Sequence, residues 1–346
     1  MRGEPVTGMI MMRSAVATGL AQRLLLGAST MLMVLWNGAA QKAVADEGGV
    51  SFWLPGQYGS LAALPGNPGW TFTSLYYHTE PSAGGGAEFA HGGEIRAGLA
   101  ARGDLFGFGP GYIFEEPVLG GQFALSVLGI VGNSKASVEA TLTGPNGNEI
   151  SGKREESLFS YGDLYPTATL KWNHGTSNYM VYLAGDIPVG DYDPDRLANL
   201  GIGHGAIDSG VGYTYFNPET GHEFSFVTGL TYNFENEHTD YQNGIDWHLD
   251  WGASQFLSPT MHIGAVGYAY QQITGDSGDG AVLGDFESRV FGVGPQVGFL
   301  FPAFGMQAYL NIKGYYEFEA ENRAEGWNAF VIFALTQAKH EEPYVK

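Results

Sequence analysis

Three ionisable residues recur at every second position in one short stretch of the sequence. Asp246, His248 and Asp250 are separated by large apolar side chains in GIDWHLDWGASQFL, residues 244–257. A histidine between two carboxylates could carry out acid–base catalysis, because it can exchange protons near neutral pH. The same alternation predicts a β-strand whose successive side chains point to opposite sides. In that interpretation the ionisable side chains face water and the intervening ones face an apolar phase.

Two serine motifs could indicate a nucleophile. GDSGD at 275–279 places Ser277 in a glycine-rich loop without a matching histidine context, and we favour a solvated acidic loop. His174 and Ser177 lie in NHGTSN, and a lipid-cleaving barrel would need such a pair side by side on the outer face of neighbouring strands. A turn explains the asparagines and glycine of this segment without any activity. We therefore expect no enzyme, and no catalytic residues.

A third motif has the spacing of metal ligands. GDYDPDRL at 190–197 places Asp191, Asp193 and Asp195 at the one-three-five positions of a calcium loop. Arg196 occupies the position of the required glycine, and Ile202 that of the bidentate glutamate. These departures exclude an EF-hand and leave a weak Ca²⁺ site between outer loops as an open alternative. No other metal and no cofactor is expected.

The composition restricts the compartment and the partners. An arginine-containing start, the apolar run LLLGASTMLMVLW and the Ala43-Val44-Ala45 site predict a signal peptide over residues 1–45. Those residues carry four of the 16 basic and one of the 36 acidic residues, so the mature chain has a net charge of about −23. This charge excludes nucleic-acid binding. The absence of cysteine excludes disulfides and thiolate chemistry.

The overall balance of residues favours a membrane barrel. Charged residues make up 15% of the chain, against about 25% in average globular proteins, and there are 53 glycines in 346 residues. Aromatic residues reach 14%, yet no mature segment is apolar for the 18 residues that a membrane helix needs. Alternating runs of 10 to 13 residues match strands that cross a bilayer at a tilt better than the shorter strands of a soluble sandwich.

The alternation assigns side chains to two faces of the predicted wall. The face directed to the lumen is expected to carry Asp246, His248, Asp250, Tyr309, Asn311, Lys313, Tyr315 and Glu317. The face directed to lipid is expected to carry an aromatic girdle of Trp247, Trp251, Tyr232, Phe234, Tyr316, Phe318 and Trp327.

We predict an all-β, antiparallel transmembrane barrel of fourteen strands, with twelve as the alternative. The expected strands begin near residues 70, 94, 105, 122, 136, 164, 178, 207, 224, 246, 262, 289, 307 and 327. Short periplasmic turns are expected at 102–104, 132–135, 173–177, 217–221, 258–260 and 301–305. Long outer loops are expected at 79–93, 144–161, 187–206, 235–244, 273–287 and 319–326. The connection at 115–121 is short where this alternation requires a long one.

The remaining segments flank the barrel, which is expected over residues 70–337. Residues 46–69 are a periplasmic linker or a small plug, and we favour the plug because Phe52, Trp53 and Leu54 would otherwise be exposed to water. Residues 338–346 form a C-terminal tail.

A family resemblance supports these expectations. The string from YPTATLKWNHG to DWGASQFLS at 165–258, SFWLPGQYGSLAALPGNPGW near the mature start and GWNAFVIFAL near the end resemble proteins assigned to the meta-pathway of phenol degradation. The resemblance implies an outer-membrane barrel of Gram-negative bacteria, distantly similar to FadL-type channels. It implies transport of small hydrophobic or aromatic compounds and brings no catalytic residues.

Three functions follow, in decreasing order of preference. The first is a channel for passive uptake of small hydrophobic or aromatic compounds. The second is a structural or adhesive surface barrel with a closed lumen, and the third is a lipid-modifying barrel enzyme. The expected partners are outer-membrane lipid and lipopolysaccharide, small hydrophobic solutes and the barrel-assembly machinery.

Overall fold

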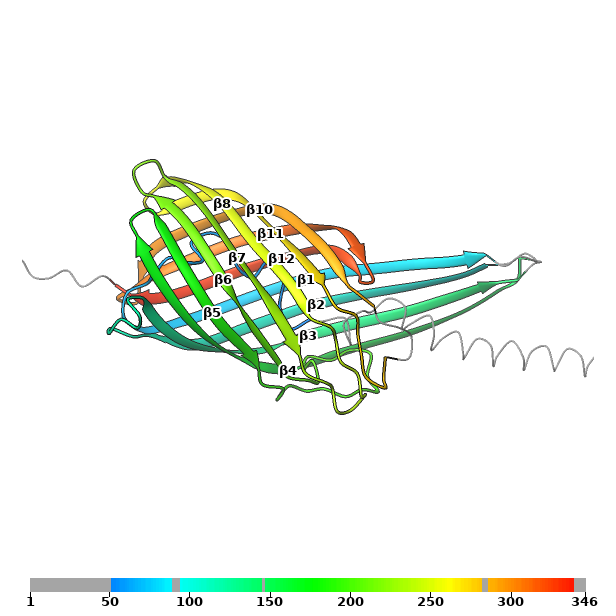
Figure 1. The fold of residues 1–346 in the computed structure, drawn as a ribbon. Coiled ribbons are helices and arrows are strands. Elements are labelled where there is room, and N and C mark those ends of the chain that lie inside the picture. The colour runs from blue at the N-terminus through cyan, green and yellow to red at the C-terminus, as the bar shows by residue number, and fades with distance from the viewer. Residues whose placement is uncertain (1–50, 89–93, 145–146, 282–285, 339–346) are drawn as a thin grey trace, which may run out of the picture.

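Twelve antiparallel strands close into one barrel in the described part of the chain (Figure 1). The computed structural model describes residues 51–88, 94–144, 147–281 and 286–338. The strands are β1 (Gly69–Glu88), β2 (Glu94–Ile113), β3 (Gln122–Thr143), β4 (Glu149–His174), β5 (Ser177–Asp186), β6 (Ala206–Asn217), β7 (His222–Asn233), β8 (Asp246–Ser258), β9 (Met261–Gln272), β10 (Arg289–Ala303), β11 (Met306–Glu321) and β12 (Glu325–Gln337). Among the described residues, no helix has the length and apolar character needed to traverse a bilayer.

The period-two pattern of the sequence produces this wall. Along β8, buried Asp246, His248 and Asp250 alternate with partly exposed Trp247, Leu249 and Trp251. Each strand pairs with its sequence neighbours, and β1 pairs with β12 from Phe72↔Leu335 to Ser82↔Glu325. Closure gives every strand of the ring two partners, which an apolar bilayer requires because it offers no water to unpaired backbone groups.

The preferred count of fourteen strands is wrong, and the alternative of twelve is confirmed. The strands expected from residues 94 and 105 are both part of β2, and those expected from 122 and 136 are both part of β3. The expected turns at 102–104 and 132–135 lie opposite each other in the sheet, with Gly103 paired to Ser134. Their glycines and polar residues suggested turns, whereas the period-two alternation continues through them without a break.

Merging these strands also corrects the loops. The expected loop at 79–93 belongs largely to β1, and the one at 144–161 largely to β4. The connection 115–121 then falls at the same end as the short connections 175–176, 218–221, 259–260 and 304–305. Long connections lie at the opposite end, over 187–205, 234–245 and 273–288. The irregularity in the expected alternation was therefore a product of the wrong strand count.

Four strands continue far beyond the rest of the wall (Figure 1). We call this part the extension and define it as residues 79–88 of β1, 94–103 of β2, 134–143 of β3 and 149–158 of β4. Its lower limit is the row Thr79, Gly103, Ser134 and Leu158, which are paired in succession across the four strands. The two strands that flank these four are shorter at this end, since β5 ends at Asp186 and β12 starts at Glu325. The extension therefore projects from the end of the barrel that carries the long connections.

Candidate functional site

The structure buries most of the ionisable and polar side chains that the sequence assigns to the lumen. Asp246, His248 and Asp250 are each 1% exposed. On β11, the buried side chains are Asn311, Lys313, Tyr315 and Glu317. Tyr309 is partly buried, and its hydroxyl lies 3.0 Å from Nε2 of the buried His262. The structure thus brings β8 and β11 together inside one barrel, although neither strand pairs with the other.

The residues assigned to the lipid face lie on the other side of the wall. Tyr232, Phe234, Tyr316, Phe318 and Trp327 are each at least 40% exposed, and Trp247 and Trp251 are partly exposed. Neighbouring rings extend this surface, as in Tyr76 and Phe106, whose centroids are 5.7 Å apart. An apolar, aromatic exterior around a polar interior is the arrangement that a bilayer stabilises.

Residues 51–66 run through the lumen and form hydrogen bonds with its wall. The Asp250 carboxylate accepts from the backbone N–H groups of Gly56 at 2.8 Å and Tyr58 at 3.0 Å. Lys313 Nζ donates to the carbonyl oxygens of Gln57 and Tyr58, both at 2.8 Å. The Tyr315 hydroxyl donates to the Gly56 carbonyl at 3.0 Å. Backbone groups that a sheet would otherwise pair are therefore satisfied here by charged and phenolic side chains.

A second set of contacts holds the following turn of the segment. The Glu223 carboxylate accepts from the Ser60 hydroxyl and from the Leu61 N–H. The Ser60 hydroxyl also lies 2.8 Å from that of Ser254. Lys171 Nζ donates to the Ala62 carbonyl at 2.8 Å. Because these partners belong to β7, β8 and β4, the segment reaches from one side of the wall to the other.

Aromatic stacking fixes the start of the segment above these contacts. The Trp53 ring stacks on His248 with centroids 3.5 Å apart and an interplanar angle of 17°. His248 Nε2 lies 2.8 Å from the Asp208 carboxylate. The ring of Phe52 lies 5.7 Å from that of Tyr165. The imidazole is therefore enclosed between an indole and a carboxylate, which positions it as a docking group for the segment.

The lumen is filled at this level. Val227, Tyr270 and Phe330 are 0% exposed, and Lys313 and Trp53 are 2% exposed. Side chains of the wall and the 51–66 segment together leave these residues out of contact with water.

Several lumen residues were missed in the sequence. Asp186, Asp208 and Glu223 are 7%, 0% and 4% exposed. Glu223 shares its face of β7 with Ser225, and Asp208 occupies an inward position of β6. Their inward positions in the period-two alternation of these strands are the sequence feature that could have identified them. Contact with the segment could not be read from the sequence, since Ser60 and Glu223 are separated by 163 residues.

The serines of the two motifs form hydrogen bonds to residues other than a histidine. His174 and Ser177 are register partners at the turn between β4 and β5, but the Ser177 hydroxyl lies 3.1 Å from the Tyr213 hydroxyl. Ser277 pairs through its backbone with Gln242, and its hydroxyl donates to the Gln242 amide oxygen at 3.4 Å. Both serines have a structural role in these contacts.

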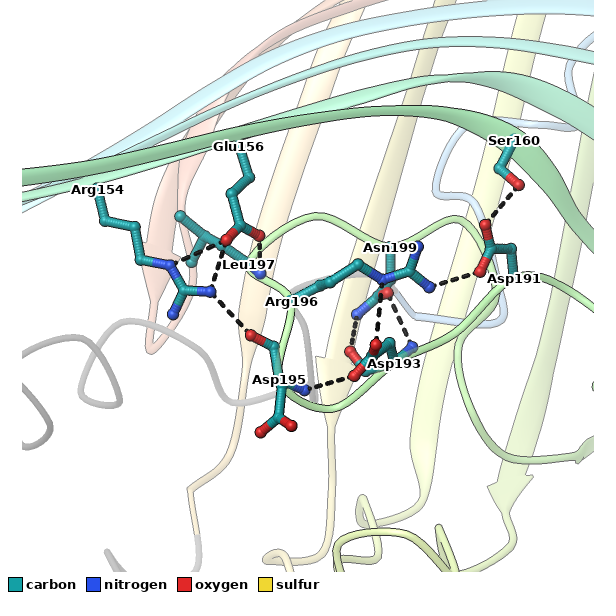
Figure 2. A network of polar contacts seen from close by, with 9 residues as sticks. All are labelled: Arg154, Glu156, Ser160, Asp191, Asp193, Asp195, Arg196, Leu197 and Asn199. Carbon is teal, nitrogen blue, oxygen red and sulfur yellow. Dashed lines mark hydrogen bonds and ion pairs between the residues drawn. The ribbon is translucent and has the colours of Figure 1, made fainter.

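The three loop aspartates point to different partners and do not converge (Figure 2). Asp191 accepts from Arg196 at 2.5 Å and from the Ser160 hydroxyl at 2.7 Å, and these contacts lower the pKa of its carboxyl, the arginine first. Asp193 accepts from the Asp195 N–H at 3.0 Å. Within the described ranges, no group of three or more carboxylate or histidine residues is placed to hold a metal. The loop is instead attached to β4, where Glu156 accepts from the Leu197 N–H.

Fold and wall together define an outer-membrane β-barrel, which confirms the predicted class and location. A solved outer membrane channel from Pseudomonas putida F1 is similar, with a TM-score of 0.60 and 15% identity, over 82% of this chain and 99% of that chain. A FadL homologue from Pseudomonas aeruginosa matches with a TM-score of 0.37 and 8% identity, over 78% of this chain and 89% of that one. The CymD monoaromatic hydrocarbon channel matches with a TM-score of 0.31 and 7% identity, over 80% and 90%. No curated protein matches the chain.

Within this class the family is also shown. The sequence profile of the family described as "Putative MetA-pathway of phenol degradation" matches residues 83–333. The chain belongs to this family, which confirms the resemblance seen in the sequence.

Proposed function

We propose that the protein is a channel for passive uptake of small hydrophobic or aromatic compounds, and that residues 51–66 close it as a plug. The observation that carries the proposal is the way the lumen is closed. A separate segment, held by hydrogen bonds to β3, β4, β6, β7, β8, β10 and β11, crosses it. Such contacts can break and reform without disturbing the backbone pairs of the barrel.

The lining supports a weakly polar aromatic cargo. Tyr182, Tyr268 and Tyr315 of the wall place rings inside the barrel, and each ring carries a hydroxyl group. Tyrosine combines an apolar face with a polar edge, so a lining of this kind suits ring compounds with few polar groups. The description of the family refers to phenol degradation, which agrees with this solute class.

The proposed mechanism is diffusion down a gradient. Displacement of the plug exposes Asp250, Lys313 and Glu223 to water, so their lost contacts with the segment are replaced by hydration. No step requires bond making or an energy source. Contacts with outer-membrane lipid, with lipopolysaccharide and, during insertion, with the barrel-assembly machinery are part of the same proposal.

A reversible lock tests the plug. The hydroxyls of Ser60 and Ser254 are 2.8 Å apart, and the chain has no cysteine, so Ser60→Cys with Ser254→Cys introduces one disulfide across the lumen. Liposomes with the oxidised variant should admit phenol no faster than empty liposomes. Reduction should restore the flux of the wild-type protein. Each single cysteine variant is the control and should not respond to oxidant.

Three results would count against the proposal. Equal phenol flux in wild-type and empty liposomes would rule out the channel function. Equal flux in the oxidised and reduced lock would show that solutes bypass the segment. Electrical silence of the reduced protein in a planar bilayer would favour the structural or adhesive barrel.

A further inference from the structure

A buried carboxylate at the end of β5 receives no hydrogen bond from the part of the chain that the structure describes. Asp186 is 7% exposed, and neither of its carboxylate oxygens has a partner there. A carboxylate that loses its hydration without gaining a donor destabilises a fold, and nearly all buried polar groups in native proteins are therefore hydrogen-bonded. Asp186 thus weakens the fold, and a ligand that donates hydrogen bonds to it would offset this effect.

Asp186 lies on the inner face of the wall, opposite Tyr165 of β4. Leu164 and Ile187 exchange backbone hydrogen bonds one position beyond this pair and are exposed on the outer face. Their register is the same as that of the regular β4–β5 pairs. The Tyr165 ring lies 5.7 Å from the ring of Phe52, at the start of the plug. An unpartnered carboxylate therefore lies next to aromatic rings of the wall and the plug.

The nearest carboxylate on the inner face of β4 has a different role. Asp163 accepts from the Gly190 N–H at 2.7 Å with one oxygen and from the Ile202 N–H at 2.8 Å with the other. Both donors belong to the connection 187–205, so Asp163 attaches this connection to the wall. The Asp186 carboxylate is buried as well, but among the described residues it holds no other part of the chain. Contacts within the fold therefore explain Asp163 and do not explain Asp186.

The side chains that adjoin Asp186 on the inner face are small. Ala206 of β6 is its register partner, and Ala184 lies two residues before it on the same face of β5. Asp208, two residues beyond Ala206, contacts His248 with one oxygen and leaves the other oxygen without a partner in the described ranges. Hydrogen-bond acceptors without donors therefore follow the inner face of β5 and β6, beside side chains that take up little space.

This arrangement selects for a ligand that donates hydrogen bonds. A hydrocarbon ring can pack on Tyr165 and Phe52 but leaves the carboxylate without a donor. A hydroxyl group on such a ring supplies the donor, and O–H···O⁻ hydrogen bonds are short and strong. Because both oxygens of Asp186 are free, two hydroxyl groups on adjacent ring carbons can each bind one of them.

We propose that Asp186 forms a binding site for hydroxylated aromatic compounds, with ring hydroxyls donating to its carboxylate and the ring packed against Tyr165. The site lies where β5 meets the connection 187–205. A solute that enters from the end with the long connections therefore meets it before it reaches the plug contacts at Asp250. The inference rests on the proposed function for the class of solute, and it adds a preference for rings that carry a hydroxyl group.

The experiment measures binding by fluorine NMR titration of the full chain in detergent, with empty micelles as the blank. The probes are para-fluorophenol and para-fluorotoluene, which differ in carrying a hydroxyl or a methyl group. Asp186→Ala removes both acceptor oxygens, whereas Asp186→Asn keeps the shape of the side chain and one of them. Asp240→Asn, at an exposed loop position, is the matched control. Heat-modifiable migration in SDS gels shows that each variant is folded.

Wild-type protein should bind para-fluorophenol about tenfold more tightly than para-fluorotoluene, because only the phenol donates to a charged acceptor. Asp186→Ala should lose this preference through weaker binding of the phenol alone, and Asp186→Asn should lose part of it. Tyr165→Leu should weaken binding of both probes, and Asp240→Asn should match wild type. Unlabelled catechol should displace para-fluorophenol at lower concentration than hydroquinone, whose two hydroxyls lie on opposite sides of the ring.

A stability measurement separates a ligand site from a structural role. Without ligand, Asp186→Ala should unfold at a higher temperature than wild type, because the substitution removes a buried carboxylate that has no donor. A lower unfolding temperature would show that the carboxylate supports the fold and would overturn the proposal. Equal affinity of wild type and Asp186→Ala for para-fluorophenol would also overturn it.

Two further comparisons define the ligand and the dependence on transport. Tighter binding of para-fluorobenzylamine, a cation at neutral pH, than of para-fluorophenol would assign the carboxylate to a cation and overturn the hydroxyl assignment. Binding is measured without a gradient, whereas the channel is tested by phenol flux into liposomes. A protein that binds para-fluorophenol through Asp186 but admits no phenol would therefore retain the site and lose the channel function.

Discussion

Asp250 shows how a single carboxylate can hold a chain segment inside a barrel. One carboxylate oxygen accepts from the N–H group of Gly56, and the other accepts from that of Tyr58. Each oxygen of the buried carboxylate therefore has a partner in the segment. Lys313 of β11 donates to the neighbouring carbonyl groups of Gln57 and Tyr58. The segment is thus bound through its backbone at this point, and Gly56 leaves room for the rings of Tyr315 and Tyr268.

Substitution of Asp250 by Asn should open the lumen more often. The amide oxygen can accept only one of the two N–H groups, and the amide nitrogen meets the other N–H as a second donor. Hydrogen bonds to charged groups contribute roughly 1.5–3 kcal/mol each, so the displaced fraction should rise about tenfold or more. Ion conductance in a planar bilayer measures it. The control, Asp240→Asn, changes a carboxylate in an exposed loop and should conduct like wild type. An unchanged conductance in Asp250→Asn would contradict the role of Asp250 in holding the plug.

For the strands, the period-two alternation predicted the face of the wall on which a side chain lies more accurately than the residues at which a strand begins and ends. The strand 246–258 and the inward set of β11 were predictable because two solvents impose a strict period of two. The extension was not predictable, because GNSK and RGD have the composition of turns and only their mutual pairing, Gly103 with Ser134, identifies them as strand. The plug contacts were equally hidden, since sequence carries no signal for a hydrogen bond between Gly56 and Asp250.

The ion pairs of the extension make a prediction about pH. Hydrogen bonds from Lys135 and Lys153 lower the pKa of Glu155 from 4.5 to about 2. A carboxyl whose pKa is lowered by folding stabilises the fold above its unfolded pKa, and this contribution is lost as the pH falls from about 4.5 towards 2. Carboxyl ¹³C NMR of the glutamates, assigned with Glu155→Gln, should show this low titration.

Removing both lysines provides the comparison. With Lys135→Met and Lys153→Met, Glu155 should titrate near its ordinary value, because its two donors are gone. Arg154→Met should leave the titration in place, since Arg154 lies on the opposite face of β4 and pairs with Glu156. A Glu155 titration near 4.5 in the unmodified protein would refute the arrangement.

In the whole molecule, closure of the barrel does not depend on the outer part of the extension. The register that closes the ring, β1 with β12, ends at Ser82, so the outer part of the extension takes no part in it. Replacing residues 84–98 and 139–153 each by an Asn-Gly turn should therefore leave twelve closed strands. Heat-modifiable migration in SDS gels should persist, with phenol flux as in wild type. A variant that never reaches the compact form would show that the extension is needed for folding.

In the proposed channel, the charge of the interior should affect ion selectivity but not the flux of neutral solutes. Seven buried carboxylates belong to the strands of the wall: Asp163, Asp186, Asp208, Glu223, Asp246, Asp250 and Glu317. Among the described residues, the basic side chains that donate hydrogen bonds to the plug are Lys171 and Lys313. A lumen lined mainly by one sign of charge raises the local concentration of the opposite ion. With residues 51–66 deleted, the reversal potential in a KCl gradient should therefore shift towards that of K⁺. Asp208→Asn with Asp246→Asn in the same deletion should reduce the shift.

Anion preference in the deletion variant would contradict the inward placement of these carboxylates. The flux of uncharged phenol should be nearly equal in the deletion variant and in its Asp208→Asn, Asp246→Asn derivative, because a neutral solute does not respond to the fixed charge. Ion selectivity and solute flux are then controlled by different features of one lumen, the first by the carboxylates of the wall and the second by the position of the segment that fills it.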